Sequence, residues 1–388
     1  MLHNRELLDF DVDVATGTAR VLDALPADES AFTSLGLGGR DRDAALTSLL
    51  RRRCLSPQRD DIVQILAAFG ARSPLELAFM GHGLSLADGL WYRAPGPLVR
   101  WEDINCYDND WDDAFCTAVL TRDYARLATC SPDVPDITTG GQLAKVWERR
   151  DGHTWLLKES LLPSGADLEG ALLAFELCQM LLGEAACQPL RVVERMGRRM
   201  SASPLMHGPD EELVQGRRLY AMAGYSGSED TDPIDPANPD QLAQVLTRAG
   251  IVDASVLVAK VFTFKALALH QDLHEGNLGV IRNVLTGDCR IAPLFDFDRA
   301  FGFPSRDYPY EAVCKSPALA TMLCCSNFSD LDQSWDWSWY DPQTLEGFEA
   351  RVASAFAGYD DLPQNFGELI SGLFAMQRDY VNSVAGKE

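Results

Sequence analysis

A short segment of the chain combines residue types that could transfer a phosphoryl group. Within residues 270–301, Asp272 is followed five residues later by Asn277 and, further downstream, by Asp296. Phosphoryl transfer needs one carboxylate near the acceptor hydroxyl, and it needs further oxygen ligands that hold Mg2+ against the triphosphate of ATP. The spacing therefore predicts Asp272 as the catalytic base and Asn277 and Asp296 as ligands of Mg2+.

The interval from Asp272 to Asn277 matches the catalytic loop of protein kinases, H-R-D-x-x-x-x-N, with His270 at the position of the His. The downstream segment 294–298, Leu-Phe-Asp-Phe-Asp, occupies the place of Asp-Phe-Gly. A polar surface loop is one alternative, because such a match also arises by chance. A metal site built from His270, Asp272 and His274 alone is another, which the lack of further converging His or Cys ligands disfavours.

The two expected metal ligands are predicted to lie on one hairpin. Apolar-rich segments at 278–283 and 290–296 flank the polar turn 285–288, a pattern typical of two antiparallel strands. A rigid support of this kind would keep Asn277 and Asp296 close together.

A kinase-type site also requires an upstream Lys that grips the α- and β-phosphates and a helix Glu that holds this Lys. Lys158 ends the second of two apolar-alternating segments around the turn 150–152, where an unpaired Lys is costly to bury. The next segment has helical periodicity and places Glu169 and Glu176 on one face. Either Glu could reach Lys158; the alternative is that both are solvated helix charges.

A glycine-containing loop lies just upstream of these two segments. Its adjacent glycines, Gly140 and Gly141, let backbone N–H groups approach a phosphate closely. Thr138, Thr139 and Lys145 add further donors. A Gly-Gly hairpin turn without a ligand is the ordinary alternative. The order of glycine loop, Lys, acidic helix, catalytic loop and metal Asp is that of the kinase-like fold.

Several passages of the chain together resemble the HipA-like serine/threonine kinases, specifically a subgroup with a long amino-terminal arm. They are Thr-Thr-Gly-Gly-Gln-Leu-Ala-Lys (138–145) with Trp147, Trp-Leu-Leu-Lys (155–158), His-Gln-Asp-Leu-His-Glu-Gly-Asn followed by Leu-Gly-Val-Ile-Arg (270–282), and Ala-Pro-Leu-Phe-Asp (292–296). Segments 83–91 and 101–105 are similar to the arm of that subgroup. The resemblance covers most of the chain up to about residue 305.

The resemblance implies the roles given above to Asp272, Asn277, Asp296 and Lys158, with ATP and Mg2+ as cofactors. It also implies that the loop 138–145 lies at the ATP site, where relatives can phosphorylate a hydroxyl of their own chain, here one of the two threonines. The expected acceptor is a Ser/Thr hydroxyl of a protein, and an antitoxin-type partner is expected because the family includes toxin kinases.

The chain departs from this family at two places. The family usually has Asn where this chain has His270, and Gly170 and Ala171 occupy the place expected for the helix acid. Small-molecule phosphotransferases of the aminoglycoside and choline kinase type match 270–277 and 295–298 equally well, so they remain an alternative. A pseudokinase that acts as a regulatory interaction module is a further alternative, which both departures motivate.

The expected fold class is α+β: a bilobal protein-kinase-like fold with a small β-rich lobe, a large helical lobe and an amino-terminal α/β arm. We expect the arm at 1–130, the small lobe at 131–207 and the large lobe at 208–388. Pro204 to His207 would form the hinge that contacts adenine. The polar, Pro-rich segment 227–240 is expected to be a connecting loop.

Local patterns predict several further elements. A hairpin is expected around residues 15–18, followed by three short helices within 41–80, with two starts marked by Ser56-Pro57 and Ser73-Pro74. The tryptophans at alternate positions in 335–339 could form a strand face or a docking surface, although buried packing is the commoner fate of such rings.

Composition limits the partners and the compartment. The 34 Lys and Arg against 57 Asp and Glu give a net charge of −23, so the surface repels nucleic acid on average, and no direct nucleic-acid binding is expected. The triple Arg at 51–53 is assigned to a helix end. The ten cysteines show no disulfide framework, and with neither a signal peptide nor a membrane span in view, a cytoplasmic location without membrane contact is expected.

Overall fold

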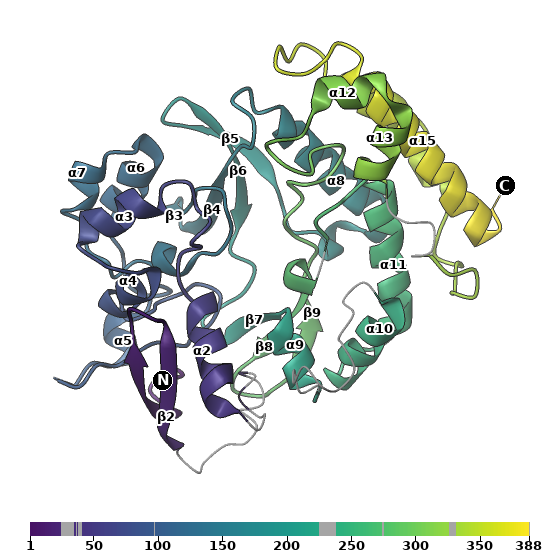
Figure 1. The fold of residues 1–388 in the computed structure, drawn as a ribbon. Coiled ribbons are helices and arrows are strands. Elements are labelled where there is room, and N and C mark those ends of the chain that lie inside the picture. Colours follow the sequence, from purple (N-terminus) through teal and green to yellow (C-terminus); the bar gives the residue numbers. More distant parts are fainter. Residues whose placement is uncertain are drawn as a thin grey trace.

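The computed structural model describes residues 1–24, 35, 37, 41–96, 98–224, 238–273, 275–325 and 331–387. His274 and most of the connector expected at 227–240 lie outside the described residues. Arm, small lobe and large lobe refer below to residues 1–130, 131–207 and 208–388. Figure 1 shows the purple and blue arm on the left and the green and yellow carboxy-terminal helices on the right, with the chain ends on opposite sides.

The arm begins with the expected hairpin, in which β1 (Leu8–Asp13) pairs antiparallel with β2 (Thr18–Ala24). The three helices expected within 41–80 are confirmed, and Ser73 caps the third by accepting a hydrogen bond from the Glu76 N–H. The start predicted at Ser56 is wrong, because its hydroxyl accepts from the Gln58 N–H in a turn instead. The arm helices are α2 (Arg42–Arg52), α3 (Ile62–Phe69), α4 (Pro74–Met80), α5 (Trp101–Ile104), α6 (Asp113–Thr121) and α7 (Tyr124–Leu127).

The small lobe is built around one antiparallel sheet with the strand order β3-β4-β6-β5. Its elements are η1 (Pro135–Thr138), β3 (Lys145–Arg150), β4 (His153–Glu159), α8 (Ala166–Leu182), η2 (Glu184–Ala186), β5 (Arg191–Arg195) and β6 (Arg198–Pro204). The sheet and the arm share a hydrophobic core, in which Val146, Leu157 and Met200 from the strands pack with Ile65 and Phe115 from arm helices. The arm therefore stabilises the sheet that carries Lys158.

The large lobe holds a second antiparallel sheet with the order β7-β8-β9. Its strands are β7 (Glu211–Gln215), β8 (Gly279–Asn283) and β9 (Cys289–Ile291), and its 3-10 turns include η3 (Glu275–Asn277) and η5 (Pro342–Leu345). The helices are α9 (Arg217–Met222), α10 (Pro239–Arg248), α11 (Ala254–Leu267), α12 (Tyr310–Lys315), α13 (Pro317–Cys324), α14 (Phe348–Ala355) and α15 (Phe366–Ala385). The hairpin predicted after Asn277 is confirmed as β8 and β9.

The alternate tryptophans of the large lobe do not form a strand. Trp337 is buried, and its ring lies 5.9 Å from that of Trp335 and 6.3 Å from that of Trp339. Lys260 of α11 lies over the Trp339 ring at 5.4 Å. These rings therefore pack against the helical core, which is the fate expected for most aromatic side chains.

A chain of buried charges joins the arm to the large lobe, and we call these five residues the arm network. They are Arg53, Asp88, Arg218, Glu212 and Arg282. Arg218 lies 3.6 Å from Asp88 and 2.7 Å from Glu212, and Arg282 lies 2.8 Å from Glu212. The triple Arg lies at a helix end as predicted, with Arg51 and Arg52 in the last turn of α2 and Arg53 as its C-cap, and Arg53 has an internal structural role in addition.

The cysteines also differ from expectation. Cys178 near the end of α8 forms a disulfide with Cys187, which follows η2, so the expectation of unpaired cysteines is wrong for these two. The pairing could not be read from the sequence, because it depends on the turn that folds residues 183–187 back onto the helix. Among the described residues, no single helix is long and apolar enough to cross a membrane, although α3 and α4 meet that test as a bent pair.

Candidate active site

Lys158 lies in the middle of the small-lobe sheet, where β4 runs between β3 and β6. Its backbone pairs with Lys145 on one side and Ser201 on the other. The ammonium forms ion pairs with two carboxylates of the large lobe, those of Asp296 and Asp298. The anionic partner expected for Lys158 is therefore present, but it comes from the segment after β9.

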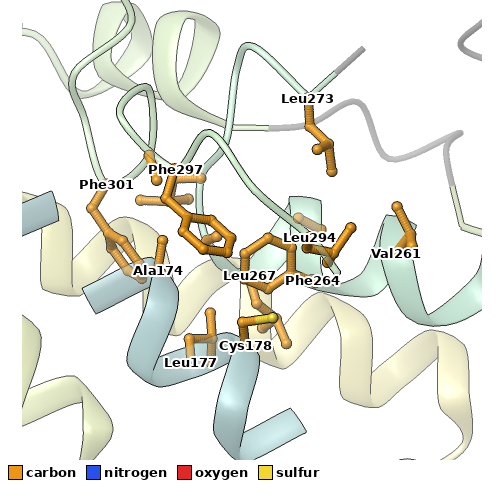
Figure 2. Close-up of a cluster of buried hydrophobic side chains, with 14 of the residues drawn as sticks. Ala174, Leu177, Cys178, Val261, Phe264, Leu267, Leu273, Leu294, Phe297 and Phe301 are labelled. Carbon is orange, nitrogen blue, oxygen red and sulfur yellow. The ribbon is translucent and has the colours of Figure 1, made fainter. Parts of the chain in front are cut away.

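Buried apolar side chains explain how that segment presents two carboxylates. Leu294, Phe297 and Phe301 are buried, and Phe297 makes an edge contact with Phe264 of α11 at 5.8 Å. Figure 2 shows these side chains packed between α8 and α11, close to Cys178. Burial of the apolar side chains fixes the backbone. The intervening aspartates consequently face Lys158.

Backbone contacts hold the same segment against the small lobe. The Leu294 N–H donates to the Ala186 carbonyl at 2.8 Å, and the Gln188 N–H donates to the Leu294 carbonyl at 2.8 Å. Asp296 itself has a positive φ of 63°, in the left-handed region where Asp is more often found than most other residues. Such strained residues cluster at functional sites because the surrounding structure has to enforce them.

The charges of this cluster shift one another's pKa values. Burial alone lowers the pKa of Lys158, but the carboxylates of Asp296 and Asp298 raise it well above the ordinary lysine value. Burial alone raises the pKa of Asp296, but the Lys158 and Lys145 ammonium groups hold it well below the usual range. Lys158 is therefore protonated and Asp296 ionised at neutral pH.

Lys145 is a second ammonium group in the same place. It pairs with Lys158 across β3 and β4, so the two side chains share one face of the sheet. Its Nζ lies over Gly141, where an added Cβ would come within 2.7 Å. Burial, followed by repulsion from Lys158, lowers the pKa of Lys145 to about 8. We call Lys145, Lys158, Asp296 and Asp298 the Lys158 centre.

The predicted catalytic loop lies against this centre through His270. Its Nε2 lies 3.0 Å from the Asp296 carbonyl oxygen, and its Nδ1 accepts the Asp272 N–H at 3.3 Å. Burial lowers the pKa of His270 to about 4, so the ring is neutral and Nε2 carries the proton. His270 therefore joins the loop to Asp296 and is engaged on both ring nitrogens.

The two expected metal ligands suit Mg2+. The Asn277 side-chain N–H donates to the Asp272 carbonyl at 2.7 Å, so this hydrogen bond uses the amide nitrogen and not the amide oxygen. The Asp296 side chain is 26% exposed and hence accessible to a cation. Mg2+ is commonly held by one or two carboxylates plus substrate phosphates. Among the described residues, no three His, Cys, Asp or Glu converge on a metal site; His274 lies outside them, so the alternative site of His270, Asp272 and His274 stays untested.

The expected pairing of Lys158 with a helix Glu is wrong in this structure. Glu169 accepts from Arg199 at 2.9 Å and from the Tyr359 hydroxyl at 2.6 Å. Glu176 pairs with Arg351 at 3.3 Å. Both carboxylates therefore pair with arginines of other elements, Arg199 of β6 and Arg351 of α14.

The glycine loop is anchored at one end and exposed at the other. The Thr138 hydroxyl donates to the Leu84 carbonyl at 2.8 Å, and that of Thr139 donates to the Asp136 carbonyl at 2.7 Å. Gly140 and Gly141 are exposed, and Gly141 has a φ of 97°. Their backbone is thus accessible to a ligand next to Lys145, whereas both threonine hydroxyls are bonded to backbone carbonyls.

The segment expected to contact adenine connects the two sheets. β6 ends at Pro204 and β7 begins at Glu211. His207 lies between them, and its Nδ1 is 3.1 Å from the Gly208 carbonyl. Burial lowers the pKa of His207. The connection is thus where a hinge is expected, and the adenine contact stays a prediction.

Asp298 was absent from the residues predicted for the site. The signal was present, since the segment Phe-Asp-Phe-Asp carries a second acid two residues after Asp296. Kinase spacing drew attention only to the first acid. The pairing with Lys158 depends on contacts between the lobes, which no local pattern encodes.

Two lobes, a Lys in the sheet and an Asp-bearing loop between them define the protein-kinase-like class. No family model and no curated protein sequence matches the chain. The structure is similar to HipA of Shewanella oneidensis MR-1, solved with HipB and operator DNA, with a TM-score of 0.54 and 11% identity over 100% of this chain and 97% of that one. It is also similar to the Helicobacter pylori proinflammatory kinase CtkA, with a TM-score of 0.45 and 15% identity over 62% of this chain and 92% of that one.

The likeness to HipA extends over the whole chain, arm included, and shows that this chain has the HipA-like fold. The α+β bilobal kinase-like fold predicted from the sequence is therefore confirmed, and so is the resemblance at the level of the fold.

Proposed function

We propose that the protein is an ATP- and Mg-dependent phosphotransferase that acts, as HipA-like kinases do, on a Ser/Thr hydroxyl of a protein. One observation carries the proposal: the sheet Lys158, Asp296 and the loop of Asp272 and Asn277 are linked in space, through the Lys158 ion pair and His270. The outermost of these residues, Lys158 and Asp296, are 138 positions apart, so their convergence owes nothing to local sequence.

Each residue has a defined task in this proposal. Lys158 and Lys145 bind phosphate oxygens, and the exposed backbone of Gly140 and Gly141 adds N–H donors. Asn277 and Asp296 would hold Mg2+, which neutralises charge on the transferred phosphoryl group when bound. Asp272 is exposed and accepts the proton of the acceptor hydroxyl.

Autophosphorylation of Thr138 or Thr139 forms a finer part of the proposal. Both hydroxyls donate to backbone carbonyls, so either threonine must leave its hydrogen bond before it can act as an acceptor. Each such bond contributes about 1 kcal/mol, which is a modest barrier to a local rearrangement.

The test is phosphoryl transfer from γ-labelled ATP with Mg2+, read by mass spectrometry of the protein. Wild type should label Thr138, Thr139 or another hydroxyl, whereas Asp272→Asn should show none. Asp288→Asn, in the exposed turn of the β8–β9 hairpin, is the matched control and should label like wild type. Equal labelling in wild type and Asp272→Asn would refute the base role.

A second candidate acceptor class is the small alcohols. The sequence of residues 270–277 and the two acids of the Lys158 centre match the aminoglycoside and choline kinase type equally well. If wild type transfers no label to protein, aminoglycosides and choline should be tried in the same assay. ATP binding without any transfer would favour the regulatory-module alternative.

Partners and location are proposals of the same kind. The similar HipA was solved with HipB and DNA, so an antitoxin-type protein partner is proposed here. With a net charge of −23, any contact with DNA would run through that partner rather than through this chain. The cytoplasm is the proposed location, since that is where ATP and a protein substrate meet.

A further inference from the structure

All three acidic side chains of α8 are engaged away from Lys158. Asp167 accepts the Leu161 N–H at 2.8 Å and the Leu162 N–H at 3.1 Å, together with the Ser160 hydroxyl. Glu169 and Glu176 are held by arginines as described above. The helix therefore has no carboxylate left for the lysine, although kinase-type catalysis requires an acid that holds it.

The place of the missing acid is filled by the backbone of the large lobe. A Cβ added at Gly170 would come within 2.9 Å of the Ala300 carbonyl oxygen and 2.9 Å of the Phe303 ring. Real Cβ atoms avoid such contacts, and a Glu side chain has no path through them. At Gly170, α8 thus packs directly onto the segment that begins at Asp298, and it must be Gly to do so.

The two carboxylates on Lys158 differ in their access to solvent. The Asp298 side chain is 11% exposed, whereas that of Asp296 is 26% exposed. The more accessible Asp296 is the one that the catalytic-loop His270 contacts through its backbone. Asp298 is the more buried of the two, and Lys158 is its ion-pair partner.

We propose that Asp298 takes over the task of the helix acid: it is a positioning residue that holds Lys158 against the phosphates of ATP. This inference rests on the proposed function. It assigns different tasks to the two acids, because Asp296 is released to bind Mg2+ when nucleotide enters while Asp298 keeps the ammonium in place. Lys158 thus keeps Asp298 as an ion-pair partner after Asp296 has bound Mg2+.

The proposal explains why the chain tolerates a Gly where relatives of the protein-kinase class carry a helix Glu. Supplying the acid from the segment after Asp296 couples the position of Lys158 to the docking of Phe297 and Phe301 between α8 and α11. The lysine is consequently in place only when the metal-binding segment is also in place.

A double-mutant cycle on ATP binding tests the proposal. ATP affinity with saturating Mg2+ is measured by titration calorimetry for wild type, Lys158→Met, Asp298→Asn and the double variant. Asp298→Asn should weaken ATP binding about tenfold or more, and the double variant should bind like Lys158→Met alone, because Asp298 acts through the lysine. Lys158 keeps Asp296 as a partner in Asp298→Asn, so this variant should fold.

The Mg2+ concentration needed for ATP binding distinguishes a residue that positions Lys158 from a residue that binds the metal. At a fixed ATP concentration, the Mg2+ concentration at half-maximal binding should be unchanged in Asp298→Asn and raised in Asp296→Asn. Asp307→Asn, an exposed acid further along the same segment, is the control and should match wild type throughout.

Three results would overturn the proposal: ATP binding to Asp298→Asn within twofold of wild type, additive losses in the double variant, or a raised Mg2+ requirement in Asp298→Asn. If folded wild type binds no ATP, the proposed function fails and takes this inference with it. If wild type binds ATP and Asp298→Asn binds it equally well, the inference alone fails.

Discussion

The arm network and the Lys158 centre are both groups of buried charged residues, but they compensate the loss of hydration in different ways. In the arm network, arginines alternate with acids along an unbroken chain, and Arg53 also donates to the carbonyls of Gly83 and Leu90 at 2.9 and 2.8 Å. Arginine suits this task because its planar guanidinium presents several fixed donors. Every member of the network has at least one ion-pair partner within this chain.

The cations of the Lys158 centre are lysines, whose single ammonium is a compact and mobile charge. Among the described residues, the Lys145 ammonium has no hydrogen bond or ion pair. It faces the exposed glycine loop, whose backbone N–H groups can approach a phosphate. The comparison shows that buried charged residues alone do not indicate a ligand-binding site. A lysine without an ion-pair partner, next to accessible backbone N–H donors, is the better indication of one.

If the Lys158 centre serves catalysis, changes near it should cost activity rather than stability. Asp272→Asn should lower the rate of phosphoryl transfer by about a thousandfold, since a positioned base typically contributes between a hundredfold and ten thousandfold. The exposed Asp272 carboxylate should contribute little to folding. Single-turnover kinetics measure the transfer rate, and urea unfolding measures the stability. A large loss of stability with an unchanged transfer rate would mean that Asp272 is structural rather than catalytic.

If the arm network is structural, breaking it should have the opposite effect. Asp88→Asn removes the acid between Arg53 and Arg218 and leaves both cations buried, which should destabilise the protein by about 3–5 kcal/mol. Asp9→Asn, on an exposed position of β1, should change stability by less than about 0.5 kcal/mol. Denaturant unfolding of both variants decides, and a stable Asp88→Asn would show that the network is dispensable.

Asp136, a buried acid just before the glycine loop in the sequence, extends the comparison because it should make the stability of the protein depend on pH. Burial raises the pKa of Asp136 to about 7, although the Trp147 N–H donates to its Oδ1 at 2.8 Å. The folded state therefore holds a proton that the unfolded state releases near pH 4, so this group's contribution to stability falls as pH rises from about 4 to about 7.

The change should be about 2 kcal/mol between pH 5.5 and 7. Asp136→Asn keeps an acceptor for Trp147 and carries no charge, so its stability should depend less on pH and exceed that of wild type at pH 8. Urea unfolding at several pH values measures this. Parallel pH profiles for the two proteins would mean that Asp136 does not titrate in this range.

Among these variants, Lys145→Met is expected to have the smallest effect on ATP binding and stability. Lys145→Met should weaken ATP binding about tenfold, the value of one hydrogen bond to a charged group, because Lys158 still grips the phosphates. Stability should stay within about 1 kcal/mol, since the ammonium has no partner to lose among the described residues. Calorimetric titration with ATP and Mg2+ checks this; full affinity in the variant would place the phosphates elsewhere.

Local patterns predicted much of the fold. The β8–β9 hairpin, the small-lobe strands around residues 150–152 and the helix cap at Ser73 were readable because turn and cap residues act on their near neighbours. The start at Ser56 failed because one hydroxyl can close a turn as well as cap a helix. The kinase-like order of these elements then sufficed to predict the fold class.

The site was only partly predictable, since its pairings cross between lobes. Spacing predicted Asp272, Asn277 and Asp296 as one group; in the structure His270 links the loop of Asp272 and Asn277 to the Asp296 backbone, and the roles of the three residues stay predictions. The partner of Lys158 was misassigned to Glu169 or Glu176. Helical periodicity shows which face of the helix an acid occupies, but it does not show which cation packs against that face. The disulfide of Cys178 likewise depends on a turn that sequence spacing does not reveal.

The central claim is that the Lys158 centre awaits a Mg-bound nucleotide, and calorimetric titration of ATP with and without Mg2+ tests it most directly. Wild type should bind ATP in a Mg-dependent manner, and Asp296→Ala should lose that dependence while remaining folded. Folded wild type that binds no ATP, or that binds it equally well without Mg2+ and in Asp296→Ala, would contradict the claim.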